Sequence, residues 1–224
     1  MGKSQRDKKL NRKGESIFKK LATAYPEPKT ALEFSTPLEL LVAVILSAQC
    51  TDQRVNAVTK TLFRKYRSAK DYAAVAQEEL EQDIRSTGFF RNKAKSIRAC
   101  CSILAEQHGG NVPESMEELV VLPGVGRKTA NCVLGSSFGQ NSGIVVDTHV
   151  KRLAERLGLS PEKDPDKIEM DLMELVPREH WHEFGILLIL HGRAVCDARK
   201  PRCPDCVLRR ECPSAENFMK TFRR

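Results

Sequence analysis

The sequence has no long hydrophobic run: it contains no stretch of about 18 uncharged apolar residues, the length that crosses a bilayer. Its first 15 residues, MGKSQRDKKLNRKGE, have no apolar stretch behind their charges and do not form a secretory signal. We expect them to be a flexible basic arm that contacts phosphates, or a plain solvated tail. These absences argue against a membrane-spanning or exported protein and favour a reducing compartment, the cytoplasm.

Strand patterns are scarce as well. Only residues 143–146, GIVV, look extended, and they have no partner strand. Elsewhere apolar residues recur at helical spacing, with a first helix expected from Ser16 and helix caps expected at Asp52 and Asn92. The sequence therefore predicts an all-α protein, and its 224 residues suffice for one domain or two small ones.

The charge balance favours an anionic partner. Lysine and arginine number 37 against 29 aspartates and glutamates, which gives a formal net charge of +8. An excess of this size places nucleic acid ahead of anionic lipid as the partner. Because many basic proteins bind neither, charge alone is a weak indication.

The eight cysteines fall into two groups. Four are scattered in apolar helical segments and are interpreted as small core residues: Cys50, Cys100, Cys101 and Cys132. The other four lie within residues 196–212 and are separated by six, two and five residues: Cys196, Cys203, Cys206 and Cys212. Four thiolates this close can hold a zinc ion or a [4Fe–4S] cluster, and the spacing alone favours the two about equally.

The stretch LPGVGRKTAN, residues 122–131, combines two glycines with the start of a helix. Gly124 and Gly126 permit a tight turn that aims backbone N–H groups outward, and Val125 and Arg127 belong to the same turn. Such a turn at a helix N-terminus binds phosphate and grips a nucleic-acid backbone irrespective of base sequence. The alternative is an ordinary helix–helix turn without a ligand, because a lone GxG motif is weak.

Lys128 lies in the first turn of the helix after this hairpin, where the positive end of the helix dipole disfavours a cation. A lysine is nucleophilic only when its amine is neutral, and the helix terminus, Arg127 and burial would all favour that form. From the sequence alone, a charged lysine that contacts phosphate is the simpler role. Asp147 shifts the balance, because it fits a helix N-cap after an apolar run and could stabilise positive charge or assist a deprotonation.

These motifs occur together with others: LLVAVILSAQCTDQRVN, TGFFRNKAKSI, EQHGGNVPESMEELVVLPGVGRKTAN, VVDTHVKRLAERLGL and the C-terminal cysteines. Over roughly residues 16–213 the sequence resembles the endonuclease III branch of the helix-hairpin-helix DNA glycosylases. The resemblance implies a bifunctional glycosylase and AP lyase that flips oxidised pyrimidines out of duplex DNA and removes them. Lys128 would attack C1′, Asp147 would stabilise the cationic sugar, and β-elimination would cut the strand 3′ to the abasic site. It also implies that the four clustered cysteines bind a [4Fe–4S] cluster. Because hydrolysis and elimination need no electron transfer, we expect the role of this cluster to be structural.

Further contacts with DNA follow from the same resemblance. Gln49 matches a glutamine that enters the gap left by the flipped base. Phe89 falls where a leucine wedge is usual, and an aromatic ring can also wedge between base steps, which leaves the lesion range and opposite-base preference open. A basic patch for phosphates is implied in the loop after the first cluster cysteine: Arg199, Lys200 and Arg202.

The implied architecture has two helical lobes with a DNA-binding cleft between them. Residues 30–141 would form a six-helix barrel with the helix-hairpin-helix motif, and residues 1–29 and 142–224 would form the cluster domain. Lys128 and Asp147 would face each other at the mouth of the cleft. The expected partner is double-stranded DNA with damaged bases or abasic sites, bound by a monomer in the bacterial cytoplasm.

Three alternatives stay open. In related adenine-mismatch glycosylases the position of Lys128 is not lysine, which argues against a mismatch enzyme. A glycosylase for alkylated purines is a closer rival that a panel of lesions would separate. A DNA-structure-binding protein without catalysis would use the same hairpin and cluster, and the pairing of Lys128 with Asp147 argues against it.

Overall fold

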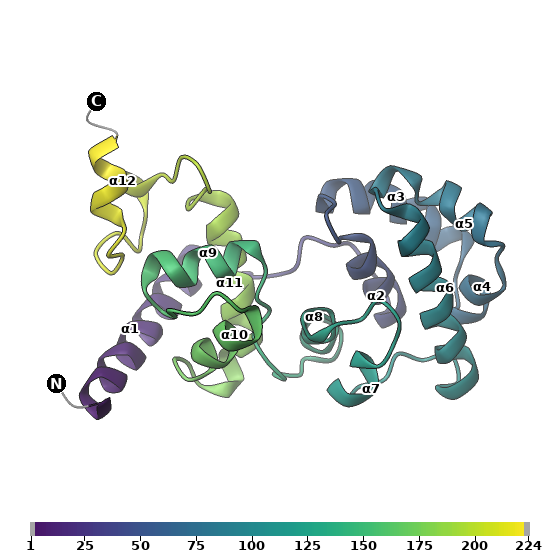
Figure 1. The fold of residues 1–224 in the computed structure, drawn as a ribbon, viewed down its shortest axis with the longest axis horizontal. Coiled ribbons are helices and arrows are strands. Elements are labelled where there is room, and N and C mark those ends of the chain that lie inside the picture. Colours follow the sequence, from purple (N-terminus) through teal and green to yellow (C-terminus); the bar gives the residue numbers. More distant parts are fainter. Residues whose placement is uncertain (1–2, 222–224) are drawn as a thin grey trace. The chain divides into compact units, whose positions relative to one another are not determined.

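Helices make up the regular secondary structure of the part of the chain that the computed structural model describes, residues 3–221 (Figure 1). These residues contain no β-strand, so the prediction of an all-α protein is confirmed. The chain divides into two compact units. The middle unit is Thr30–Gln140, and the split unit combines Met1–Lys29 with Asn141–Arg224. No helix among the described residues is long and apolar enough to cross a membrane.

The middle unit is built around an apolar helix, α2 (Pro37–Leu46). Thr36 caps this helix by accepting a hydrogen bond from the Glu39 amide, and Pro37 begins it. Residues 40–46 are all buried, so α2 is surrounded by the rest of the unit. The other helices of this unit are α3 (Asp52–Lys65), α4 (Ala69–Ala74), α5 (Gln77–Asp83), the 3-10 turn η1 (Arg85–Thr87), α6 (Phe90–Gln107), α7 (Met116–Val120) and α8 (Arg127–Phe138).

The middle unit has seven α-helices in residues 30–140, one more than the six-helix arrangement that the resemblance implied. The additional boundary lies at Val75 and Ala76, whose extended backbone separates α4 from α5. Ser68 and Asp71 form a capping box at the start of α4, and this short helix packs against α6.

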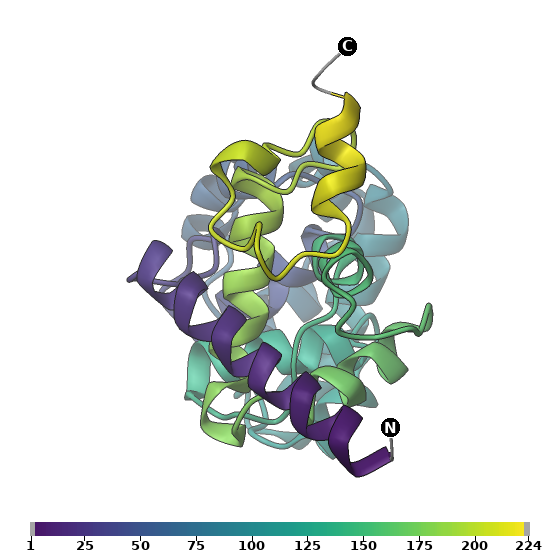
Figure 2. The ribbon, with the colours of Figure 1, turned by 90° about the vertical axis from the view of Figure 1, so that its left-hand side faces the viewer.

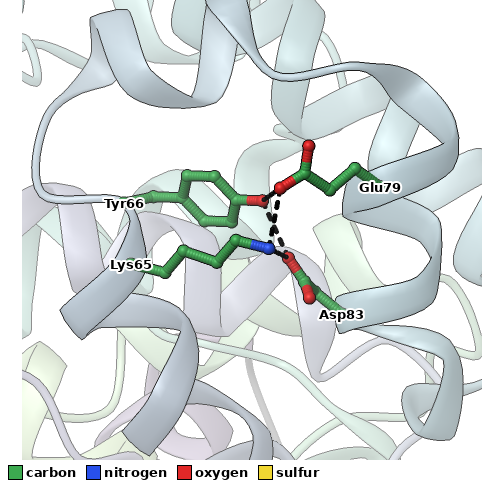
Figure 3. A network of polar contacts seen from close by, with 4 residues as sticks. All are labelled: Lys65, Tyr66, Glu79 and Asp83. Atoms are coloured by element: carbon green, nitrogen blue, oxygen red, sulfur yellow. Dashed lines mark hydrogen bonds and ion pairs between the residues drawn. The ribbon is translucent and has the colours of Figure 1, made fainter.

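A polar network joins α3 to α5 at the edge of the middle unit (Figure 3). The Lys65 ammonium lies 2.8 Å from the Glu79 carboxylate and 2.7 Å from that of Asp83. The buried Tyr66 hydroxyl donates to Asp83 at 2.7 Å. Burial of the ring and this hydrogen bond raise the pKa of Tyr66 to about 12. The network therefore holds two helices together through a phenol that is neutral at physiological pH.

The split unit packs a long N-terminal helix against the C-terminal third of the chain. Its helices are α1 (Lys3–Ala24), α9 (Thr148–Leu157), α10 (Pro165–Met173), the 3-10 turn η2 (Arg178–His180), α11 (Trp181–Ala194), the 3-10 turn η3 (Cys203–Asp205) and α12 (Ala215–Thr221). Figure 2 shows α1 running obliquely across α11. Ile17 and Leu21 of α1 share a core with Phe184 and Leu187 of α11.

The expected flexible arm before Ser16 is wrong for the described residues, because α1 is helical from Lys3. Leu10 lies two turns before Ile17 and packs partly against the same core, which extends the buried face of the helix. At Gly14 an added Cβ would approach the Leu175 Cβ to 2.6 Å. A glycine in mid-helix therefore allows close contact between α1 and the turn after α10.

Two expected helix starts are also corrected. α3 is capped by Thr51, which accepts from the Arg54 amide, while Asp52 is its first helical residue. α6 begins at Phe90, so Asn92 lies inside its first turn. The chain enters α6 through Gly88 and Phe89, both with positive φ, and no side chain caps the helix there.

Candidate functional site

The hairpin of the middle unit joins α7 to α8 (Figure 1). Gly124 has a φ of +81°, and an added Cβ would lie 2.8 Å from the Ser96 Cβ on α6. Both the backbone conformation and the packing therefore require glycine at this position. The hairpin is held closely on α6, which fixes where α8 begins.

Gly126 differs from Gly124, although the sequence pattern treats them alike. Its φ is −97°, it is the N-cap of α8, and an added Cβ would meet no atom within 4 Å. Packing inside the unit does not demand glycine here. The open space lies in front of a helix N-terminus, whose first amides have no acceptor within the helix. An anion approaching the backbone would use this space.

Val125 does not present an outward amide, contrary to our expectation for the whole turn. Its N–H donates to the Leu122 carbonyl at 3.0 Å, and its side chain is buried in the core of the middle unit. Val125 thus anchors the hairpin from inside. Gly124, Gly126 and Arg127 are exposed around it.

Lys128 is the second residue of α8 and is exposed, so the expected burial is wrong. Lys128 directly follows Arg127 in the first turn of α8. Cys132 follows one turn later, and burial raises the pKa of this thiol to about 11 although the Lys128 charge opposes the shift. Cys132 therefore stays protonated near neutral pH and forms no thiolate–ammonium pair with Lys128.

Gln49 and Phe89 share a rare backbone conformation. Their φ angles are +52° and +47°, and among the described residues no other non-glycine residue has a positive φ. Gln49 is exposed, and Phe89 is 63% exposed, which is unusual for a phenylalanine. Strained residues that fold stability does not explain are typical of binding and catalytic sites.

Lys93 lies behind these two loops, and the sequence analysis missed it. Its side chain is buried, and Nζ donates to the Leu46 carbonyl and to the Thr87 carbonyl at 2.8 Å each. A sequence signal exists, because Lys93 precedes Ile97 by one turn and so falls on the apolar stripe of α6. A lysine on a buried face is rare unless its charge has partners.

Asp147 lies in the split unit and is the N-cap of α9, as the sequence predicted. Its Oδ1 accepts from the amides of His149 at 2.8 Å and Val150 at 2.9 Å. Two glycines of α11 hold this region closely: an added Cβ at Gly185 would lie 3.3 Å from the Val145 nitrogen, and one at Gly192 would lie 2.9 Å from the His149 Cβ. The extended segment 143–146 and the start of α9 are thereby fixed on α11.

The four clustered cysteines line one narrow cavity of the split unit. Its walls are apolar side chains of α9, the cysteine segment and α12: Leu153, Leu157, Leu208 and Phe218. Burial raises the pKa of Cys206 to about 11, and the neighbouring cysteine sulfurs add to the shift. In the described residues no three His, Cys, Asp or Glu side chains are arranged to hold a single metal ion.

Arginines of α9 hold the cysteine segment in place. Arg156 donates to the Asp197 carbonyl and the Ala198 carbonyl, each at 2.7 Å, and to the Cys196 sulfur at 3.3 Å. Arg152 donates to the Cys196 carbonyl at 3.1 Å. The same helix that begins at Asp147 therefore supports the cysteines.

The basic loop between the first two clustered cysteines is shaped by Asp197. Its Oδ1 accepts from the amides of Arg199 at 2.8 Å and Lys200 at 3.0 Å, and these bonds lower the pKa of the carboxyl group. Arg199, Lys200 and Arg202 are all exposed, and Arg202 also donates to the Ala194 carbonyl. Arg199 and Lys200 thus lie on the turn at Asp197, and Arg202 follows in the same loop. Lys128 and Asp147 belong to different units, and their proximity stays a prediction.

Comparisons with known proteins show the family of the chain. Residues 42–178 match the model of the HhH-GPD superfamily base excision DNA repair proteins. The chain is 55% identical to an endonuclease III of Synechocystis sp. over 200 residues, 89% of this chain and 90% of the relative. A non-covalent endonuclease III–DNA complex matches with a TM-score of 0.90 and 44% identity, covering 94% of this chain and 98% of that one. A trapped endonuclease III–DNA covalent intermediate matches with the same score and identity, covering 93% and 98%.

Proposed function

Because the chain belongs to the HhH-GPD superfamily of base excision DNA repair proteins, we propose that it is a bifunctional DNA glycosylase and AP lyase. Its substrate is double-stranded DNA that contains oxidised pyrimidines or abasic sites. The observation that carries this proposal is the exposed Lys128 amine in the first turn of α8, directly behind the open N-terminus at Gly126. A glycosylase without lyase activity has no need of a primary amine there.

Lys128 is the nucleophile. Its neutral amine forms a bond to C1′ of the damaged nucleotide while the bond from C1′ to the base breaks and the base departs. Loss of a proton from nitrogen and opening of the sugar ring give an imine between Nζ and C1′. Removal of a C2′ proton then expels the 3′ phosphate, which cuts the strand, and hydrolysis of the imine frees the lysine.

Asp147 stabilises the positive charge that develops on the sugar as the base leaves. Its Oδ1 is occupied by two backbone amides, which orients the carboxylate and keeps its second oxygen available in a fixed direction. The cap therefore preorganises the group that carries the charge. Proton transfers to and from the reacting sugar use the same carboxylate.

DNA is held by backbone contacts and probed by two loops. The amides at Gly124, Gly126 and Arg127 bind phosphate, as do the exposed cations of the Asp197 turn, Arg199, Lys200 and Arg202. Gln49 enters the gap left by the flipped nucleotide, and the exposed Phe89 ring wedges between base steps. Phosphate contacts position the enzyme, and the two loops detect the lesion.

The four clustered cysteines bind a [4Fe–4S] cluster. The donor set supports this assignment, because four cysteines line one apolar cavity in a segment with few other core residues. The spacing of the cysteines alone suits a zinc ion as well, and the similarity of the chain to endonuclease III favours the cluster. The cluster would hold residues 196–212 in shape and, through Arg152 and Arg156, support α9.

Borohydride trapping tests the proposal directly. The full-length protein is mixed with a duplex that carries one oxidised pyrimidine, and borohydride is added to reduce any imine to a stable cross-link. We expect cross-linked protein and strand cleavage for the wild type, and neither for Lys128→Ala. A Lys128→Ala protein that still cross-links and cuts would falsify the assignment of the nucleophile.

A panel of lesions separates the remaining possibilities. Release of alkylated purines with no action on oxidised pyrimidines would move the enzyme to a different substrate class. Tight binding to every duplex without release of any base would indicate a DNA-binding protein without catalysis. We further propose that the protein acts as a monomer in the cytoplasm.

A further inference from the structure

The buried lysine of α6 contacts both strained loops of the middle unit. Nζ of Lys93 donates to the Leu46 carbonyl at the end of α2, three residues before Gln49. It also donates to the Thr87 carbonyl, two residues before Phe89. Both distances are 2.8 Å. One ammonium group therefore joins the end of α2 to the end of η1, two segments that are separated by about 40 positions in the sequence.

The backbone of Lys93 adds a third contact. Its N–H donates to the Phe89 carbonyl at 3.1 Å, which closes the first turn of α6 directly behind the exposed ring. On the other loop, the Cys50 amide donates to the Ser47 carbonyl at 3.1 Å and closes the turn that holds Gln49. Each strained residue is thus enclosed in a short turn, and Lys93 joins the two turns.

Burying the Lys93 ammonium group costs free energy, so a lysine at this position needs a specific explanation. Lys93 is 5% exposed, and desolvation lowers the pKa of its amine. An apolar residue would fit the stripe that Lys93 shares with Ala94 and Ile97 without this penalty. An ammonium group at this position is explained by the two carbonyl groups that it holds together.

We propose that Lys93 is a positioning residue that fixes the Gln49 and Phe89 loops relative to each other, so that gap filling and wedging occur together when a nucleotide is flipped. This proposal rests on the proposed function, which assigns the two loops to DNA. Lys93 touches neither the sugar nor the base and acts only through the loops.

The first test compares Lys93→Met with Lys95→Met in full-length, cluster-loaded protein. Lys95 lies on the same helix but is exposed, so its replacement removes the same charge without touching the loops. We expect Lys93→Met to slow base release from a lesion duplex by roughly 10- to 100-fold, the size of loss that misplaced groups cause. Lys95→Met should stay within about twofold, as expected for a surface change. Equal rates for the two variants would overturn the proposal.

A second measurement separates positioning from general damage. A preformed abasic site in single-stranded DNA requires no flipping, so borohydride trapping on it reports the lysine chemistry alone. Lys93→Met should trap at a rate within about twofold of the wild type, since a substitution away from Lys128 leaves its chemistry intact. A loss of trapping as large as the loss of base release would mean that the whole unit is disturbed and would overturn the positioning role. Failure of the wild type to trap on an abasic site in duplex DNA as well would instead refute the proposed function.

A double-mutant cycle with Gln49→Ala gives the sharpest readout. If Lys93 acts through the Gln49 loop, the double variant loses no more base release than the larger single loss. Multiplied losses would show that the two residues act independently. Should Lys93→Met fold poorly, Lys93→Arg keeps the charge and donors for both carbonyls, and we expect it to retain base release better than the methionine variant. A Lys93→Arg rate no better than that of Lys93→Met would also contradict the proposal.

Discussion

Asp147 has two roles that one pair of substitutions can separate. Its Oδ1 caps α9 by accepting from the His149 and Val150 amides, while its negative charge is proposed to stabilise the cationic sugar. Asp147→Asn keeps a side-chain oxygen in the same position and removes the charge. Asp147→Ala removes both. The two variants should therefore differ in stability and agree in catalysis.

The structure sets the size of each effect. Loss of an N-cap side chain costs about 1 kcal/mol, and for a chain of this length 1 kcal/mol lowers Tm by roughly 2–4 °C. Asparagine caps nearly as well as aspartate, so Asp147→Asn should melt within about 1–2 °C of the wild type. Removal of a preorganised charge at a reacting centre lowers the rate by about 100- to 1000-fold, and both variants should show this loss.

Melting curves and single-turnover base release from an oxidised-pyrimidine duplex measure the two effects, with the assay run well below both melting temperatures. If Asp147→Asn releases base as fast as the wild type, the charge has no role and Asp147 is only a cap. If activity instead follows Tm across the three proteins, the catalytic loss is a consequence of fraying at α9.

Three further perturbations test other features. Gly124→Ser should destabilise the protein by about 1–2 kcal/mol, because φ at this position is positive and the added Cβ would lie 2.8 Å from the Ser96 Cβ. Gly126→Ser should leave Tm unchanged, because an added Cβ meets no atom within 4 Å. It should still weaken binding to undamaged duplex, which fluorescence anisotropy measures. Arg156→Lys cannot reach the Asp197 and Ala198 carbonyls and the Cys196 sulfur together, so chelator should bleach the iron–sulfur absorbance faster than in the wild type; an unchanged bleaching rate would argue against this support. The raised pKa of Tyr66 means that its folded form keeps a proton that the unfolded chain releases near pH 10, so the free energy of unfolding should fall between about pH 10 and 12. Tyr66→Phe should make that fall shallower in denaturant titrations, and an identical slope would show that folding does not raise the pKa of Tyr66.

Helical periodicity predicted the class of the fold, because most helices bury one regular face. The cap at Asp147 was predictable as well, since a capping oxygen acts on amides only two or three residues away. The arm before Ser16 was misjudged because its charges suggested solvation. In the structure α1 begins at Lys3, Leu10 packs partly against the core of the split unit, and Gly14 lies close to Leu175.

The roles of several residues in the candidate site could not be predicted from the local sequence pattern. Gly124 and Gly126 look equivalent in the sequence, yet only Gly124 is required by φ and by the approach of α6, a contact between distant segments. Gly185 and Gly192 lie within a helix and belong to no recognisable motif, although they allow α11 to pack closely against the segment that presents Asp147. Lys93 left a detectable signal as a charge on an apolar stripe, but its partners at Leu46 and Thr87 follow only from tertiary structure.

The proposed DNA contacts share one physical property: most of them lie at the start of a helix. Phe89 and Gly126 are N-caps of α6 and α8, Lys128 lies in the first turn of α8, and Gln49 precedes the N-cap of α3 by two residues. The partial positive charge of a helix N-terminus attracts phosphate and acts only over the first turn, so it positions DNA without adding mobile cations. The net charge of +8 instead attracts DNA over longer distances and is screened by salt. Salt should therefore slow the encounter with DNA more than it disturbs the phosphate contacts of the hairpin, because the first depends on side-chain charges and the second on backbone groups that the fold holds fixed.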